Sequence, residues 1–396
     1  MRVMENAVVP VAEEAVRAAL LGVIDPELGD NIVDLGMVKT IEVGPDGEVS
    51  VTIALTTVSC PLRGQLKNDT QARVGSLPGV TAVKVHYGEL SADEKSALMA
   101  RARWKAREGA PATDIPATCR IVAIASGKGG VGKSSVTANL AAALADRGLT
   151  VGVLDADIWG FSIPRMLGLE GQLEADGTRD EWRIRPLEVP VGDRGGRLKV
   201  VSMGFLAEEQ DAIMWRGMLL NRALQHFIEN VSWGDLDYLL VDMPPGTGDI
   251  QMGLARMLPR AEMIVVTTPA LAAQKVASRA ADMARKGFLR VAGVIENMSA
   301  FECEHGGLYP LFGSGGGQRL AAEIGVPLLG SIPLEPAVAA GGDAGRPAVL
   351  ARPDGAAAQA FVALAEHIVT EAIPVVEMAE CTAMGMLKAL AATPRP

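Results

Sequence analysis

The sequence predicts an α/β fold in which a mostly parallel sheet follows a small α/β (α+β) domain. After residue 118, short apolar runs alternate with helical segments, and such alternation is typical of βαβ units with buried parallel strands. Before residue 90, two strand-like runs flank a tight turn. The length of 396 residues also fits more than one domain, at about 150 residues each. We expect domains over 1–90 and 118–372, joined by a charged helix and linker over 91–117 and followed by a tail over 373–396.

Turn and helix signals divide the first domain. Asp25-Pro26 ends the first helix, because proline restricts the residue before it. Gly44-Pro45-Asp46-Gly47 is a strong hairpin signal, and Pro61 suits the first turn of a second helix. The expected elements are a helix over 11–23, strands over 33–43 and 48–55, a helix from about Pro61 and a strand over 80–86.

The second domain begins after a charged, helix-prone segment, Ser91–Glu108, and a linker rich in proline and alanine, 109–116. Its apolar runs are short enough for strands, and helical segments separate them. The expected strands are 120–125, 150–154, 238–241, 263–267, 291–295 and 326–332.

A phosphate-binding loop follows the first of these strands. Gly127–Ser134 fits the pattern G-x-x-x-x-G-K-[ST], and a helical run, Ser134–Arg147, comes directly after it. Glycines let backbone N–H groups surround a phosphate chain, and the helix N-terminus adds partial positive charge. The domain is therefore predicted to be a P-loop NTPase domain that binds ATP. The residues expected to hold the nucleotide are Gly127, Lys128, Gly129, Gly130, Val131, Gly132, Lys133, Ser134 and Ser135.

Three aspartates directly follow two of the predicted strands. Asp155 and Asp157 end one strand, and Asp242 ends another in the Walker B pattern. Ligands bind at the carboxyl ends of strands in open α/β sheets. We expect Asp155 and Asp242, with the Ser134 hydroxyl, to support Mg²⁺.

Phosphoryl transfer depends mainly on positioning and charge. We therefore expect Lys133 to reach the terminal phosphates and Asp157 to orient or activate the attacking water. The loop after Asp242, residues 243–249, combines prolines with glycines and is typical of a switch that senses the γ-phosphate.

A second lysine inside the loop, Lys128, is not required by a generic P-loop. It resembles the deviant Walker A motif of the MinD, ParA and nitrogenase-iron-protein class. The resemblance implies that Lys128 contacts the nucleotide bound by the opposite subunit of a homodimer. The expected catalytic residues are thus Lys128, Lys133 and Asp157.

Further segments resemble the Mrp/ApbC-type P-loop ATPases, which are iron–sulfur cluster carrier proteins. The resemblance covers about residues 10–370 and rests on the segments Ser126–Ser134, Leu154–Gly160, Met214–Gly217, Asp237–Asp249, Thr267–Pro269 and Glu296–Ser299. It implies that Asn297 recognises the adenine. It also implies that a bound cluster, of the 4Fe-4S type, passes to iron–sulfur apoproteins with the help of assembly factors.

The first domain resembles the SufT-like iron–sulfur assembly domain. The matching segments are Asp25–Gly29, Ile32–Gly36 and Leu55–Leu62. In this resemblance Cys60 is the reactive position. A thiol next to a helix start favours thiolate chemistry, but a buried and inert cysteine is an equally good interpretation.

One departure from the family concerns the cluster. Members that share a cluster across a dimer carry Cys-x-x-Cys after the Asn-Met-Ser segment, whereas this chain has Cys303 followed by Gly306 at the second position. One thiolate per chain gives a dimer two ligands, and a four-iron cluster normally takes four. His305, Cys381 or an outside thiol could supply the rest, and a loop cysteine that binds nothing remains the alternative for Cys303.

Composition limits the partners. A net charge of −10 argues against nucleic acid as the main partner, because phosphate binding needs a basic face. The sequence contains no run of about 18 apolar residues, so no membrane span is predicted. No signal peptide is visible, and four widely spaced cysteines fit a reduced, cytoplasmic protein.

Two other functions stay open. The first is a MinD- or ParA-like positioning ATPase; MinD-like proteins end in a basic amphipathic helix, but the segment 378–390 contains one lysine, Lys388. A nucleotide-dependent scaffold that has lost its cluster would bind only client proteins. The leading hypothesis is an ATP-hydrolysing, homodimeric iron–sulfur cluster carrier.

Overall fold

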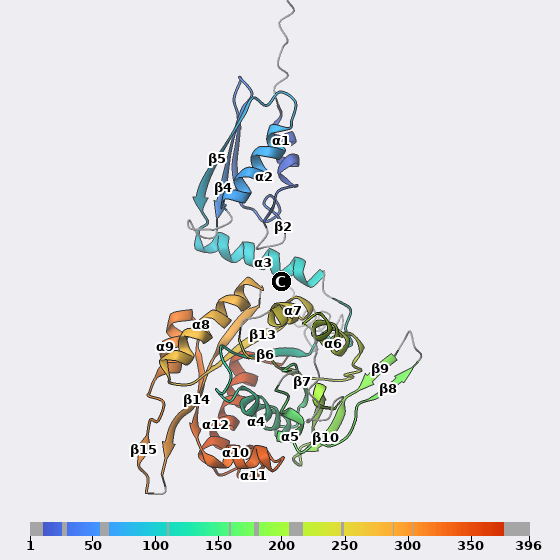
Figure 1. The fold of residues 1–396 in the computed structure, drawn as a ribbon, viewed down its shortest axis with the longest axis vertical. Coiled ribbons are helices and arrows are strands. Elements are labelled where there is room, and N and C mark those ends of the chain that lie inside the picture. The colour runs from blue at the N-terminus through green and yellow to red at the C-terminus, as the bar shows by residue number, and fades with distance from the viewer. Residues whose placement is uncertain are drawn as a thin grey trace, which may run out of the picture. The chain divides into compact units, whose positions relative to one another are not determined.

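The computed structural model describes residues 11–25, 30–55, 63–108, 111–157, 160–177, 182–205, 217–246, 249–287, 289–303 and 305–375 (Figure 1). The chain divides into two compact units, Met1–Gly109 and Ala110–Pro396. No helix in the ranges just given is long and apolar enough to cross a membrane.

The first unit contains a three-stranded sheet covered by helices. Its elements are α1 (Glu13–Leu20), β1 (Ile24–Asp25), β2 (Asp30–Asn31), β3 (Val38–Val43), β4 (Glu48–Leu55), α2 (Arg63–Gly75), β5 (Ala82–Glu89) and α3 (Ala92–Glu108). Strand β4 pairs antiparallel with β3 and parallel with β5. Val49, Val51 and Ile53 alternate along β4 and are fully buried, as the sequence pattern predicts.

The hairpin expected at 44–47 is therefore confirmed. The first strand is shorter than expected and begins at Val38, because residues 32–36 form turns. Gly36 lies in this segment with φ 74°, a left-handed conformation that favours glycine. The helix expected from about Pro61 is α2, whose described part begins at Arg63.

The second unit contains a nine-stranded sheet in the order β10-β11-β7-β12-β6-β13-β14-β15, with β16 also paired to β14. Pairing is parallel from β11 to β14 and between β14 and β16, so the predicted mostly parallel sheet is confirmed. The strands are β6 (Arg120–Ser126), β7 (Thr150–Asp155), β10 (Leu187–Val191), β11 (Gly196–Ser202), β12 (Tyr238–Asp242), β13 (Glu262–Thr267), β14 (Arg290–Glu302), β15 (Leu308–Tyr309) and β16 (Leu328–Leu334).

Helices cover both faces of this sheet (Figure 1). Helices α6, α7, α8 and α9 contribute to one apolar cluster, whereas α4, α11 and α12 contribute to the other. The helical elements are α4 (Lys133–Asp146), α5 (Ile163–Met166), η1 (Met203–Phe205), α6 (Gly217–Asn230), α7 (Asp249–Met257), α8 (Leu271–Lys286), α9 (Gly316–Ile324), α10 (Pro336–Asp343), α11 (Ala348–Ala351), α12 (Ala356–His367) and η2 (Ile368–Ala372).

Five strands of this unit were not expected from the sequence. Two of them, β8 (Glu174–Gly177) and β9 (Trp182–Arg185), form a small hairpin apart from the main sheet. The other three, β10, β11 and β15, belong to the main sheet. Strand β11 contains charged residues between its apolar ones, so its sequence lacks the continuous apolar run of the central strands. It nevertheless pairs parallel with β7, which places its last residue, Ser202, beside Asp155.

Candidate nucleotide-binding site

The glycine-rich loop joins β6 to α4. Gly130 and Gly132 have φ angles of 81° and 80°, a backbone conformation that residues with a side chain rarely adopt. A Cβ on Gly127 would lie 2.2 Å from the backbone carbon of Val276 in α8, so only glycine fits there. At Gly129 and Gly130 nothing lies within 4 Å of an added Cβ. The loop is thus packed on one side and open on the other, as a phosphate cradle requires.

Lys133 at the start of α4 is paired with the Walker B aspartate. Its Nζ donates to Asp242 Oδ2 over 2.7 Å, and the Ser134 hydroxyl donates to the same oxygen over 2.6 Å. The Thr137 hydroxyl donates to Asp242 Oδ1 over 2.8 Å. Asp242 is wholly buried, and Lys133 is 6% exposed. The buried carboxylate is therefore compensated by one cation and two hydroxyl donors.

Asp155 and Asp157 lie next to this group. Asp155 is level with Asp242 in the parallel pair β7–β12. Asp157 Oδ2 is 3.6 Å from Lys133 Nζ, and its side chain is 13% exposed. The four polar residues expected from the sequence, Lys133, Asp155, Asp157 and Asp242, are thus brought together at the carboxyl edge of the sheet.

Burial changes the acidity of these carboxyl groups. Burial, and next the charge of Asp242, raise the pKa of Asp155 to about 7, although Lys133 opposes this rise. Burial also raises the pKa of Asp157, against the influence of Lys133. Two buried carboxylates and a serine hydroxyl are oxygen donors of the kind that Mg²⁺ takes. The donor set of Ser134, Asp155 and Asp242 therefore fits a divalent cation.

Strand β14 closes the site beside the loop. Asn297 Nδ2 donates to the Val131 carbonyl over 2.9 Å, and a Cβ on Gly132 would lie 2.3 Å from that nitrogen. Met298 has φ 57°, and among the residues that the structure describes it is the only non-glycine residue with a positive φ. Asn297 thus contacts the loop directly, next to a residue of β14 with a strained backbone.

Three contacts at this edge were not foreseen from the sequence. Thr137 binds Asp242 from one helical turn beyond Lys133, a spacing that could have signalled it. Ser202 donates to Asp155 Oδ2, and Glu296 Oε2 accepts from the Gly317 backbone N–H. The Ser202 contact depends on which strands are neighbours and the Glu296 contact on the packing of α9 against β14, and no local signal gives either.

Lys128 has a different environment from Lys133. Its side chain is exposed, and its carbonyl accepts a hydrogen bond of 3.0 Å from the Ser126 hydroxyl, which fixes the loop backbone. Of the segment after Asp242, Thr247 and Gly248 lie outside the described residues, as do Ile158 and Trp159 after Asp157.

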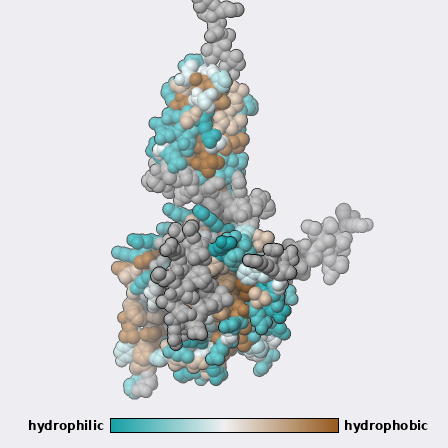
Figure 2. Space-filling view, turned by 45° about the vertical axis from the view of Figure 1, so that its right-hand side comes forward, coloured by the Kyte–Doolittle hydropathy of each residue, from teal (hydrophilic) through white to brown (hydrophobic). Residues whose placement is uncertain are grey.

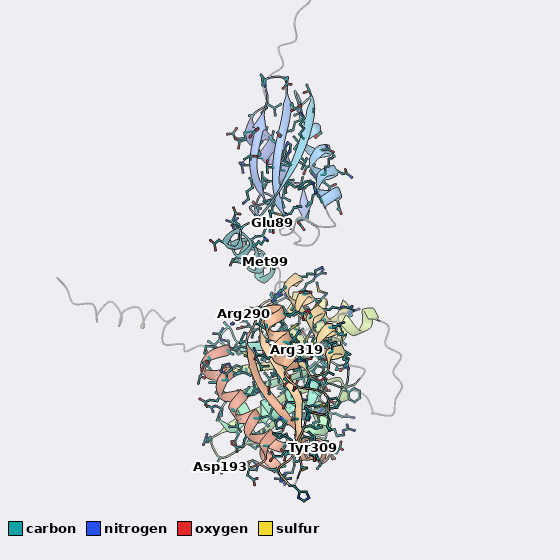
Figure 3. All side chains as sticks on the ribbon, turned by 90° about the vertical axis from the view of Figure 1, so that its left-hand side faces the viewer. Glu89, Met99, Asp193, Arg290, Tyr309 and Arg319 are labelled. Carbon is teal, nitrogen blue, oxygen red and sulfur yellow. The ribbon has the colours of Figure 1, made fainter. Side chains whose placement is uncertain are left out.

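Cys303 lies beyond the site, in the connection from β14 to β15. Its N–H donates to the Gly307 carbonyl, and the Gly306 N–H donates to the Cys303 carbonyl. Hydrogen bonds from the backbone N–H groups of His305 and Gly307, and then from the Tyr309 hydroxyl, lower the pKa of the Cys303 thiol. Figure 3 labels Tyr309 on this hairpin, at the opposite end of β14 from Arg290. The connection therefore favours a thiolate.

Cys303 is not part of a metal site with three ligands in the part of the chain that the structure describes. There, no group of three or more His, Cys, Asp or Glu side chains is placed to hold a metal ion. Gly306 has φ 77°, so a cysteine in its place would adopt a strained backbone. Cys60, Cys381 and Met214–Arg216 lie outside the described residues.

Comparison with known families assigns both units. Residues 117–369 match the model of the NUBPL iron-transfer P-loop NTPase, and residues 13–85 match that of the iron-sulfur cluster assembly protein. The first match covers the whole region from β6 to α12 and includes every residue of the site described above.

Individual relatives agree with these matches. An iron-sulfur cluster carrier protein of Mycobacterium tuberculosis is 45% identical, over 90% of this chain and 93% of its own length. One of Synechocystis sp. is 42% identical, over 90% and 96%. A nucleotide-binding protein of Archaeoglobus fulgidus, solved with ADP, is 34% identical with a TM-score of 0.48, over 61% of this chain and 91% of that chain. The family match over residues 117–369 and the two carrier relatives show that the protein belongs to the NUBPL-type iron-transfer family of P-loop NTPases.

Proposed function

We propose that this protein is an ATP-hydrolysing carrier that binds an iron–sulfur cluster and transfers it to apoproteins. The observation that carries the proposal is the likeness, over nine-tenths of the chain, to relatives named iron-sulfur cluster carrier protein. The match of the first unit to an iron-sulfur cluster assembly domain supports the same role. We further propose that it works in the cytoplasm, where four widely spaced cysteines would stay reduced.

The nucleotide site would hold ATP and Mg²⁺ through this chain's own groups. The open backbone at Gly129 and Gly130 would bind the phosphates, and the Lys133 ammonium group would neutralise negative charge on the terminal ones. Ser134, Asp155 and Asp242 would hold Mg²⁺, which neutralises charge on the phosphates when bound.

The remaining binding and catalytic roles follow from position. Asp157, close to Lys133 and slightly exposed, would orient the attacking water. Asn297 would bind the adenine, with Gly127, Val131, Gly132 and Ser135 shaping the loop around the nucleotide.

A homodimer would complete the site. Lys128 is exposed and so is free to reach the nucleotide of a second subunit. Large apolar side chains at the start of α8 and in and directly after β15 are also exposed, namely Leu271, Leu308, Tyr309, Leu311 and Phe312. Figure 2 shows hydrophobic surface at the lower left of the second unit, the side on which β15 lies in Figure 1. Such a group of exposed apolar residues is typical of an interface.

Mixing of variant chains tests the dimer. Lys128→Ala chains and Lys133→Ala chains should each hydrolyse ATP poorly, whereas a mixture should recover part of the activity in heterodimers. A mixture no more active than its components, or full activity in a proven monomer, would contradict the completion of the site by a second chain.

The cluster is the cargo, and Cys303 is its proposed ligand. Its lowered pKa favours the thiolate, which is the form that binds iron. His305, Cys381 or a low-molecular-weight thiol would supply the second ligand of each chain, and a four-iron cluster is the expected type. A site built on Cys60 in the first unit is the alternative position.

Anaerobic reconstitution tests the carrier function. The parent protein should take up iron and sulfide, develop a visible chromophore, and pass the cluster to an apoprotein. Cys303→Ser should lose the chromophore, while Cys119→Ser, which removes a buried thiol, should keep it. Loss with Cys60→Ser instead would move the site to the first unit, and a parent protein without any chromophore would leave a nucleotide-dependent scaffold.

A further inference from the structure

Ser202 is a buried hydroxyl that the motifs do not explain. It ends β11, pairs in register with Asp155 of the neighbouring β7, and is completely inaccessible to solvent. Its hydroxyl donates to Asp155 Oδ2 over 3.1 Å and accepts the Gly204 backbone N–H over 3.0 Å. Because it acts as both donor and acceptor, its orientation is fixed.

Asp155 in turn organises the loop that follows it. Its Oδ2 also accepts the backbone N–H groups of Ser162 and Ile163, over 3.2 and 3.3 Å. Its Oδ1 accepts the N–H of Asp157 over 3.2 Å. One carboxylate thus holds both ends of the loop that carries Asp157, and Ser202 is the side chain that holds this carboxylate.

The turn after Ser202 contacts the same loop from outside. A Cβ on Gly204 would lie 2.6 Å from the ring of Phe161, so Phe161 packs directly on this glycine. The hydrogen bond from the Gly204 N–H fixes the turn to the Ser202 hydroxyl. Ser202 therefore lies between Asp155 and the turn that supports the loop.

We propose that Ser202 is a positioning residue for nucleotide hydrolysis, which acts by fixing Asp155 and, through the Asp157 backbone, the carboxyl group that lies beside Lys133. The inference rests on the proposed hydrolytic function. The hydrogen bonds of Ser202 go to Asp155 and the Gly204 N–H and not to the glycines of the phosphate cradle, so we expect its effect to be larger on turnover than on nucleotide binding.

Substitution of Ser202 tests the proposal in the full-length protein. Ser202→Ala should lower kcat about tenfold, the loss expected for one hydrogen bond to a charged group, with KM for ATP changed by less than about twofold. Ser202→Thr retains the hydroxyl and should recover most of the rate. Ser278→Ala is the matched control, since Ser278 also donates to a carboxylate, Glu323 Oε1 over 2.9 Å, but on the surface between α8 and α9.

A double-variant cycle separates positioning from a general effect on folding. If Ser202 acts through Asp155, then Ser202→Ala combined with Asp155→Asn should be no slower than Asp155→Asn alone. The proposal would be overturned if the rate loss of the double variant were the product of the two single losses. It would also be overturned if Ser202→Ala were as fast as the parent. A parent protein that does not hydrolyse ATP would instead contradict the proposed function, so the two failures are distinguishable.

Discussion

The edge of the sheet around Asp242 and the connection beyond β14 hold their reactive groups in opposite ways. At the sheet edge, Lys133 and Asp242 are 6% and 0% exposed and form an ion pair with each other. At the connection, backbone N–H groups favour the thiolate of Cys303, and Leu308 and Leu311 nearby are 68% and 61% exposed. The first arrangement fixes charges in the interior of the chain, whereas the second places a thiol among exposed apolar side chains.

The largest expected effect is at the buried edge. Lys133→Ala should reduce ATP hydrolysis about 10³-fold, because the terminal phosphates lose their side-chain cation. Steady-state turnover measures this loss. Lys199→Ala is the matched control, since Lys199 is also largely buried and donates to the Trp233 carbonyl, in the segment between α6 and β12. Equal activity in the two variants would contradict the assignment of Lys133.

The sequence predicted the contiguous parts of this edge well. The loop Gly127–Ser134 and the strand ends at Asp155 and Asp242 occupy the expected places, because each motif is local and βαβ topology places all the strand ends together. Ser202 escaped prediction because it belongs to β11, whose apolar pattern is weak and whose neighbour is fixed only by the folded sheet.

The connection after β14 was less predictable for a related reason. The sequence identified Cys303 and the missing second cysteine at Gly306. The left-handed backbone of Gly306 and the contact from Tyr309 depend on the pairing of β14 with β15. Strand β14 itself continues to Glu302, well past the expected end at 295, because its polar second half pairs with β15 and β16.

The second prediction compares two thiols. In cluster-free protein carrying Cys60→Ser and Cys381→Ser, iodoacetamide at neutral pH should alkylate Cys303 at least about 10²-fold faster than Cys119. Burial raises the pKa of Cys119 to about 12, whereas hydrogen bonds lower that of Cys303, so Cys303 has much the larger thiolate fraction of the two. Mass spectrometry of timed samples gives both rates, and similar rates would contradict the contrast between the two regions.

A smaller effect is expected at Asp157, on the exposed side of the buried edge. Asp157→Ala should cut turnover about 10- to 100-fold but leave ATP affinity nearly unchanged, because the phosphate cradle stays intact. Calorimetric titration and turnover together separate the two quantities. Asp193→Ala, at an exposed turn labelled in Figure 3, should change neither. A parallel fall in affinity would show that Asp157 holds metal or nucleotide instead.

The smallest predicted effect sharpens the comparison at the connection itself. The Tyr309 hydroxyl lowers the pKa of Cys303 less than the backbone N–H groups of His305 and Gly307 do. Tyr309→Phe should therefore move the midpoint of the Cys303 alkylation profile to higher pH and slow the reaction about two- to threefold below that midpoint. The plateau at high pH should stay, since the thiolate itself is unchanged. Tyr87→Phe, in the first unit, is the control. If Tyr309→Phe moved the midpoint all the way to that of an ordinary exposed thiol, Tyr309, and not the backbone, would be the group that stabilises the thiolate.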